Sequence, residues 1–256
     1  MTKKHDIIWL DKIDSTNEEV LRRISCLDNL SVLSAYEQTA GRGQRGNIWS
    51  SGPNENLTFS IVLKFSDDGT GTSPLRACDQ FVLNAVTSLS IREFLASHGI
   101  ISDIKWPNDI YVADKKICGI LIENAVKGNM LSRSIVGIGL NINQKSFDQC
   151  LPNPVSMTQC TGKSYITESL LEEFMEVFKR YCRIYLNGHT DFNDLREQYQ
   201  TALWRKDIIS RFIDVKSGRE FTGIIRSLSE IGHIKIEDIE KGELNEFAFK
   251  DISYIL

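Results

Sequence analysis

A glycine-rich run at residues 41–49, Gly-Arg-Gly-Gln-Arg-Gly-Asn-Ile-Trp, restricts the possible folds more than any other part of this 256-residue chain. Its first six residues match G-x-G-x-x-G, the loop pattern of dinucleotide-binding folds. In those folds a helix begins at the loop, and its N-terminus binds the pyrophosphate. Here the chain continues with Asn-Ile-Trp-Ser-Ser-Gly-Pro-Asn at 47–54, which is typical of a loop. We therefore exclude a doubly wound dinucleotide fold.

The same residues favour a loop that binds an anion. Glycines let backbone N–H groups approach an anion closely, and Arg42 and Arg45 supply charge for a phosphate or carboxylate. The simpler interpretation is a mobile surface loop without a ligand. Three glycines and two arginines between Gln38 and Trp49 favour the phosphate-handling loop over it.

Strand and helix patterns alternate through most of the chain and predict a fold that contains both. Residues 57–65 alternate in polarity and predict a half-buried strand. Pro74 suits a first helical residue, and an apolar stripe continues that helix to about His98-Gly99. Ser15 with Glu18 predicts a capping box. Further strands are predicted at 7–10, 31–37, 100–104, 110–112, 116–122 and 134–143, and helices at 167–186 and 191–203.

The pattern changes at Lys206, after which short strands are separated by turns such as Lys216-Ser217-Gly218. Strands are predicted at 208–215, 220–228, 233–236 and 247–255. This spacing is typical of a small β-barrel of SH3-like type. We therefore predict two domains, a catalytic or binding domain at 1–205 and a C-terminal barrel at 206–256.

Composition narrows the class of protein further. The formal charge is -4, which is not typical of a protein that coats nucleic acid. No apolar stretch approaches the roughly 18–20 residues of a membrane helix, and the polar start does not resemble a secretory signal. The six cysteines form no C-x-x-C pair, so reduced and mostly buried thiols are expected. A cytoplasmic protein without membrane contact is predicted.

A second motif, Lys105-Trp106-Pro107-Asn108-Asp109, follows a predicted strand. Pro107 stiffens the backbone, so a lysine and a carboxylate could be held there for phosphate and Mg²⁺. A structural turn around a buried tryptophan explains these residues equally well. No metal-binding motif of the H-E-x-x-H or C-x-x-C type is present.

Five segments together resemble the biotin–protein ligases, also named biotin–[acetyl-CoA-carboxylase] ligases. They are Ser15-Thr16-Asn17, Gln38 with Gly41–Trp49, Lys105–Asp109, Lys116–Leu121 and Gly137–Asn143, in the family's order. The resemblance extends over the whole chain and implies an α+β fold, with a mixed or antiparallel sheet flanked by helices. This is the biotin ligase catalytic fold, which is like that of class II aminoacyl-tRNA synthetases, followed by a small C-terminal SH3-like barrel. It includes no counterpart of the N-terminal DNA-binding domain of repressor-type members. A monofunctional ligase that does not bind DNA is therefore implied.

The resemblance also implies an activity and its partners. Biotin and ATP, with Mg²⁺, would give biotinyl-5′-AMP, and biotin would then pass to a lysine of the biotin carboxyl carrier protein of a carboxylase. Lys116 and Arg42 would be the catalytic residues. The implied biotin-binding residues are Ser15, Thr16, Asn17, Gln38, Gly41, Arg42, Lys116, Gly119 and Gly137. For ATP and the adenylate they are Arg42, Arg45, Trp49, Lys105, Asn108 and Asn141, with Asp109 as a metal ligand.

One position departs from the family pattern. Many members carry arginine where this chain has Gln44, and in the family that arginine is linked to retention of the adenylate. Two alternatives stay open: a lipoate–protein ligase of the same fold, and a non-catalytic regulator that binds biotin or a nucleotide. A monomer or weak homodimer is expected.

Overall fold

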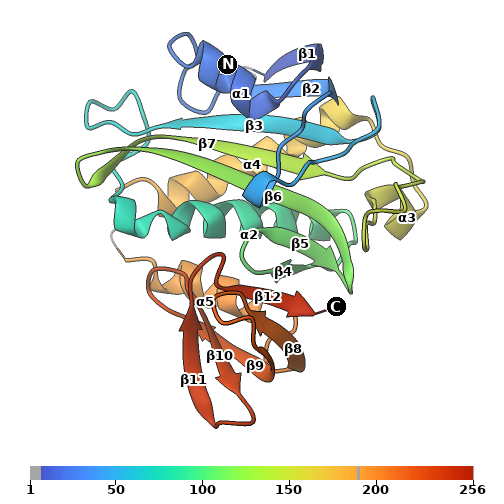
Figure 1. Cartoon of the computed structure of the whole chain (residues 1–256). Coiled ribbons are helices and arrows are strands. Elements are labelled where there is room, and N and C mark those ends of the chain that lie inside the picture. Colours follow the sequence, from blue (N-terminus) through green and yellow to red (C-terminus); the bar gives the residue numbers. More distant parts are fainter. Residues whose placement is uncertain (1–6, 189–190, 256) are drawn as a thin grey trace.

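The computed structural model describes residues 7–188 and 191–255, apart from the side chain of Arg45. A seven-stranded sheet forms the centre of the N-terminal part, with strand order β1-β2-β3-β7-β6-β5-β4 (Figure 1). β1 pairs with β2 in parallel, whereas the other neighbours are antiparallel, so the fold is mixed α+β as predicted. The strands are β1 (Ile7–Ile13), β2 (Val32–Gln38), β3 (Leu57–Lys64), β4 (Asp103–Lys105), β5 (Asp109–Val112), β6 (Lys115–Lys127) and β7 (Met130–Leu140).

Two long helices, α2 (Phe81–Ser97) and α4 (Thr167–Tyr185), lie together across one face of this sheet (Figure 1). α2 begins at Phe81 after a short 3₁₀ turn, so the prediction that Pro74 is the first helical residue was wrong. The segment after Pro74 is bound to β7 instead, because the Leu75 carbonyl accepts from the Leu131 N–H. The predicted end is confirmed, since His98 caps α2 and Gly99 has a φ of 78°.

β3 is buried on both faces, which corrects the prediction of a half-buried strand. Phe59 and Ile61 belong to the main core beneath α2 and α4. On the opposite face, Val62 packs with Val20 of α1 (Thr16–Arg23) in a second, smaller core. The polar residues of β3 are buried because α1 covers them, and Ser60 donates to side chains at the α1 N-terminus.

The predicted capping box at Ser15 is absent. Ser15 is the N-cap of α1, but its side chain makes no capping hydrogen bond. The Thr16 N–H at the helix start is instead satisfied by Gln38 Oε1 at 2.8 Å. A distant side chain therefore satisfies one of the free N–H groups at the helix start.

The C-terminal part contains a five-stranded antiparallel sheet, with order β11-β10-β9-β8-β12. The strands of this sheet are β8 (Ile209–Asp214), β9 (Glu220–Leu228), β10 (Ile234–Asp238), β11 (Glu243–Phe247) and β12 (Ile252–Ile255). β11 was not among the predicted strands. α5 (Asn193–Thr201) and α3 (Met157–Thr161) complete the α-helices of the described residues.

One apolar core runs through both parts of the chain, because Phe212, Ile225 and Ile236 of the C-terminal sheet belong to the same buried cluster as α2 and α4. The domain boundary at 205 and closure of this sheet into a barrel stay predictions.

Four of the six cysteines are exposed, so the prediction of mostly buried thiols was wrong; all six are free. No helix of the described residues is long and apolar enough to cross a membrane.

Candidate functional site

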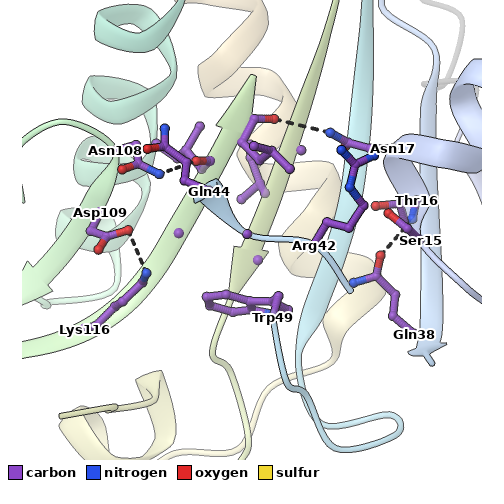
Figure 2. A pocket seen from close by; sticks show the side chains of 17 residues that line it. Ser15, Thr16, Asn17, Gln38, Arg42, Gln44, Trp49, Asn108, Asp109 and Lys116 are labelled. Carbon is purple, nitrogen blue, oxygen red and sulfur yellow. Dashed lines mark hydrogen bonds and ion pairs between the residues drawn. The ribbon is translucent and has the colours of Figure 1, made fainter. Parts of the chain in front are cut away.

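A cleft opens on the α1 side of the sheet, where the glycine-rich loop passes over β6 and β7 (Figure 2). Its empty volume is about 460 Å³. The lining residues come from six segments of the chain: Ser15, Thr16, Asn17, Gln38, Arg42, Gly43, Gln44, Trp49, Asn108, Asp109, Lys116, Gly119, Ile120, Leu121, Gly137, Ile138 and Gly139. We call it the first cleft.

The floor of the first cleft is a patch of sheet without side chains. Gly119 of β6 lies directly opposite Gly139 of β7, and Gly137 is two residues away on β7. A methyl group on Gly137 would lie 2.3 Å from Asn17 Oδ1, and one on Gly139 would lie 2.2 Å from Trp49 Cε2. Glycine in a strand interior weakens the strand unless another group must approach closely. These glycines are therefore explained by close approach rather than by a simple bulge.

One wall is formed by the buried start of α1, where Asn17 is held by three partners. Its Nδ2 donates to Glu123 Oε2 at 2.7 Å and to the Leu121 carbonyl at 3.4 Å. Its Oδ1 accepts from Ser60 Oγ at 2.6 Å. Asn17 is 4% exposed, so this network fixes its position at the cleft edge.

The glycine-rich loop forms a small hairpin over the cleft. The Gly43 N–H donates to the Asn47 carbonyl at 2.8 Å, and the Trp49 N–H donates to the Gly41 carbonyl at 2.9 Å. The Trp49 ring rests against Gly119 and Gly139 on the floor (Figure 2). Its buried indole Nε1 has no hydrogen-bond partner among the described residues.

Arg42 lies at the rim and pairs with two carboxylates. Its guanidinium contacts Glu18 of α1 and Glu123 of β6, the latter at 3.0 Å. The side chain of Arg42 is 44% exposed, so these ion pairs contribute little stability. They keep the guanidinium at the rim without burying it.

Lys116 and Asp109 form an ion pair at the other end of the first cleft, with Nζ and Oδ1 2.7 Å apart (Figure 2). Both residues, with Trp49, also line a second cleft of about 1070 Å³ empty volume. The second cleft further contains Lys105, Tyr111 and Asn141. The two clefts therefore adjoin, and Lys116 and Asp109 lie where they meet.

The Lys105–Asp109 segment is fixed from below. Trp106 is 2% exposed and donates from Nε1 to the Gly232 carbonyl at 3.0 Å. The Pro107 carbonyl accepts from Tyr199 Oη at 2.9 Å and from Asn84 Nδ2. The turn around a buried tryptophan, which was one interpretation of this motif, is thus present. It also holds the polar residues of the same segment at the clefts.

Lys105 lies in a partly apolar environment. Burial lowers the pKa of its ammonium group to about 8, helped by the nearby charges of Lys116 and Arg205 and opposed by Asp109. The ammonium group thus loses solvation that a phosphate could replace.

The structure brings most of the predicted site residues together. The first cleft contains eleven of them, and Lys105 and Asn141 line the second cleft. Asn141 is buried and donates to the Val155 carbonyl at 3.0 Å. Gly41 lines neither cleft but is covered by Gln38 and Trp49. The side chain of Arg45 lies outside the described residues.

Two residues that make central contacts in the site were not predicted from the sequence. Glu123 binds both Asn17 and Arg42, and Gly139 carries the Trp49 ring. Gly139 was within a segment already noted for its glycines. Glu123 had no local signal, because its partners lie about 80 to 106 residues away.

A model of the family described as "Biotin/lipoate A/B protein ligase family" matches residues 9–141, about half of the chain. This chain belongs to that family. Among curated relatives, the bifunctional ligase/repressor BirA of Salmonella typhimurium is 32% identical over 91% of this chain and 69% of its own length. BirA of Bacillus spizizenii is 29% identical over 92% of this chain and 74% of its own length. The biotin–[acetyl-CoA-carboxylase] ligase of Paracoccus denitrificans is 29% identical over 67% of this chain and 71% of its own length.

The family member from Aquifex aeolicus provides a structural comparison. That structure is described as a biotin protein ligase in complex with biotin and ATP, and it is 25% identical to this chain. It superposes with a TM-score of 0.77 over 97% of each chain. The match extends through the C-terminal sheet as well as the N-terminal part.

Proposed function

We propose that this protein is an ATP-dependent biotin–protein ligase. It forms biotinyl-5′-AMP from biotin and ATP and then transfers biotin to a lysine of a biotin carboxyl carrier protein. The observation that carries the proposal is the pair of adjoining clefts with Lys116 at their junction. A reaction between a carboxylate in one cleft and a phosphate in the other needs a cation at that point.

The first cleft fits biotin. Ser15, Thr16 and Asn17 offer buried polar groups at one end, with Gln38 beside them. These groups would hydrogen-bond the head group, and Gly119 and Gly137 would let the ring system lie against the sheet. The carboxylate would then reach toward Arg42 and Lys116, near the backbone of Gly41.

The second cleft fits ATP. Trp49 borders both clefts and would stack on adenine, while Asn141 would hydrogen-bond it. Lys105 and Asn108, together with Arg42 and Arg45, would bind phosphates. In the first half-reaction a biotin carboxylate oxygen attacks the α-phosphorus, and the bond to pyrophosphate breaks. Lys116 would stabilise the added negative charge on the α-phosphate.

The second half-reaction consumes the mixed anhydride. The acceptor lysine amine attacks the biotinyl carbonyl carbon, an amide bond forms, and AMP leaves with the electron pair of the broken C–O bond. One proton leaves the amine. Lys116 would remain beside the leaving phosphate, so a single residue serves both steps.

The residues of the junction also fit Mg²⁺. Magnesium is commonly held by one or two carboxylates together with substrate phosphates. Asp109 is the one carboxylate that lines both clefts among the described residues. It would hold the ion, which would neutralise phosphate charge.

Lys116→Ala is the direct test of the reaction. Removing a preorganised charge should lower the rate of biotinyl-AMP formation by roughly 10²-fold or more. Lys115→Ala is a matched control, because Lys115 is the exposed neighbour on β6 and lines neither cleft. A near-wild-type rate for Lys116→Ala would remove this residue from the mechanism.

Substrate choice is tested by pyrophosphate exchange with biotin and with lipoate. Exchange that depends on biotin supports the proposal, whereas exchange with lipoate alone supports a lipoate–protein ligase. Failure to label a purified active carrier domain with biotin would refute the ligase function and leave a non-catalytic regulator.

Four finer points belong to the same proposal. The C-terminal sheet would be an SH3-like barrel forming a domain from residue 206. The protein would be a monomer or weak homodimer, would not bind DNA, and would act in the cytoplasm. The formal charge of -4 supports the absence of DNA binding, and the free thiols support the cytoplasmic location.

A further inference from the structure

Three aromatic rings surround the ammonium group of Lys105. Its Nζ lies 4.6 Å from the ring centre of Tyr111, 5.5 Å from that of Trp204 and 5.1 Å from that of Tyr254. It also donates to Tyr111 Oη at 2.9 Å. We call these three residues the aromatic cage. They come from β5, from the segment after α5, and from β12 of the C-terminal sheet.

The rings hold the lysine without an ion pair. Among the described residues, no carboxylate lies within ion-pair distance of Lys105 Nζ. Its cross-strand neighbour Asp109 pairs with Lys116 instead. A cation beside ring faces is attracted by their negative electrostatic potential but keeps its charge unneutralised. Lys105 therefore has a fixed position and a charge that is still available to an anion.

The cage is itself rigid. The rings of Tyr111 and Trp204 are 5.1 Å apart, and those of Trp204 and Tyr254 are 5.5 Å apart. Trp204 is 3% exposed and donates from Nε1 to the Ala113 carbonyl at 2.8 Å. Tyr254 packs in addition on Phe212 at 5.3 Å. Lys105 lines the second cleft together with Tyr111 of the cage.

We propose that Tyr111, Trp204 and Tyr254 are positioning residues that aim Lys105 at the triphosphate of ATP. This inference rests on the proposed function of the second cleft. It assigns a role to β12, whose Tyr254 lies nearly 150 residues from Lys105 in the sequence. Losing a ring face would free the long lysine side chain, so that ATP binding must pay the entropy of ordering it.

The experiment compares Tyr254→Leu, Tyr254→Phe and wild type in pyrophosphate exchange, with ATP and biotin titrated separately. Tyr254→Leu should raise the KM for ATP by roughly tenfold, with the KM for biotin unchanged. Tyr254→Phe keeps the ring face and should restore a wild-type KM for ATP. Tyr181→Leu is a control, since Tyr181 is also half-buried and also lies beside a cation, Arg180, but on α4 away from both clefts.

Two results with these variants would overturn the proposal. One is a wild-type KM for ATP in Tyr254→Leu. The other is an equal rise in Tyr181→Leu, which would mean a general effect of lost stability. If Tyr254→Leu does not fold, Tyr111→Phe takes its place: it keeps all three rings, removes the 2.9 Å contact, and should raise the KM for ATP about threefold. An unchanged KM there also overturns the proposal.

The same assay separates this proposal from the proposed function. If the wild-type protein gives no biotin-dependent exchange, the proposed function fails. If it does exchange and the cage variants behave like wild type, only the positioning role of the cage fails.

Discussion

Gly137→Ala tests whether the glycine floor of the first cleft is needed for close approach. The added methyl group would lie 2.3 Å from Asn17 Oδ1 and 3.0 Å from Asn17 Cγ. Carbon and oxygen approach without strain to about 3.3 Å, so the amide must move by about 1 Å. Its bond from Ser60, 2.6 Å long, then stretches beyond hydrogen-bonding distance.

The cost follows from the bonds that Asn17 would lose. One is the bond from the Ser60 hydroxyl, and the other is the bond to the Glu123 carboxylate at 2.7 Å. A neutral hydrogen bond contributes about 1 kcal/mol and one to a charged group about 1.5–3 kcal/mol. The free energy of unfolding should therefore fall by about 2–4 kcal/mol, and the melting temperature by about 5–15 °C. Biotin affinity should fall as well, because Asn17 lines the cleft.

Calorimetry gives both quantities, with Gly128→Ala as the matched control. Gly128 is in the β6–β7 turn with a φ of 65° and no atom within 4 Å of an added methyl group. That substitution should cost about 1 kcal/mol from backbone strain and leave biotin affinity unchanged. In an Asn17→Ala background the collision is gone, so Gly137→Ala should add less than about 0.5 kcal/mol. An undiminished cost in that background would refute the explanation.

Three further predictions concern the loop and the Lys105–Asp109 segment. Gln44→Arg places a cation at the first cleft and should slow release of biotinyl-AMP; equal release rates, measured by rapid separation, would refute it. Amides of Gly41–Trp49 should exchange with solvent quickly in the free protein and slowly with biotin and ATP, because fixing glycine backbone is entropically costly; full protection in the free protein would contradict this. Trp106→Phe removes the bond to Gly232 and should destabilise the fold by about 1–3 kcal/mol, and an unchanged urea midpoint would count against it.

Local patterns predicted the elements whose signals lie within a few residues. The end of α2 at His98-Gly99 and the strand predicted at 110–112, observed as β5, are of this kind. The pattern after the glycine-rich loop correctly excluded a helix, since only a short 3₁₀ turn at Gln44–Gly46 interrupts the loop. The family resemblance then indicated which loops and strands would meet.

Two of the errors share a physical cause, which is that tertiary contacts replaced local ones. The Ser15 side chain makes no capping hydrogen bond, and the Thr16 N–H at the helix start binds Gln38 of another strand. β3 alternates in polarity like a half-exposed strand, but α1 covers its polar face, where Ser60 finds buried partners. The aromatic cage unites residues 105, 111, 204 and 254, a set that no periodicity in the sequence connects.

The position of Trp49 connects the glycine floor to the opening of the loop. Its ring covers Gly139 and also Gly119, where the proposed function places biotin. The contact gains apolar burial, but the indole N–H is buried without a hydrogen-bond partner among the described residues, which costs about 1–3 kcal/mol. The packing of the ring therefore stabilises the closed loop less than it would if the N–H had a partner. When a ligand moves the ring toward the second cleft, the indole N–H can donate to solvent or to the nucleotide. The free energy of that new hydrogen bond offsets part of the free energy needed to open the loop.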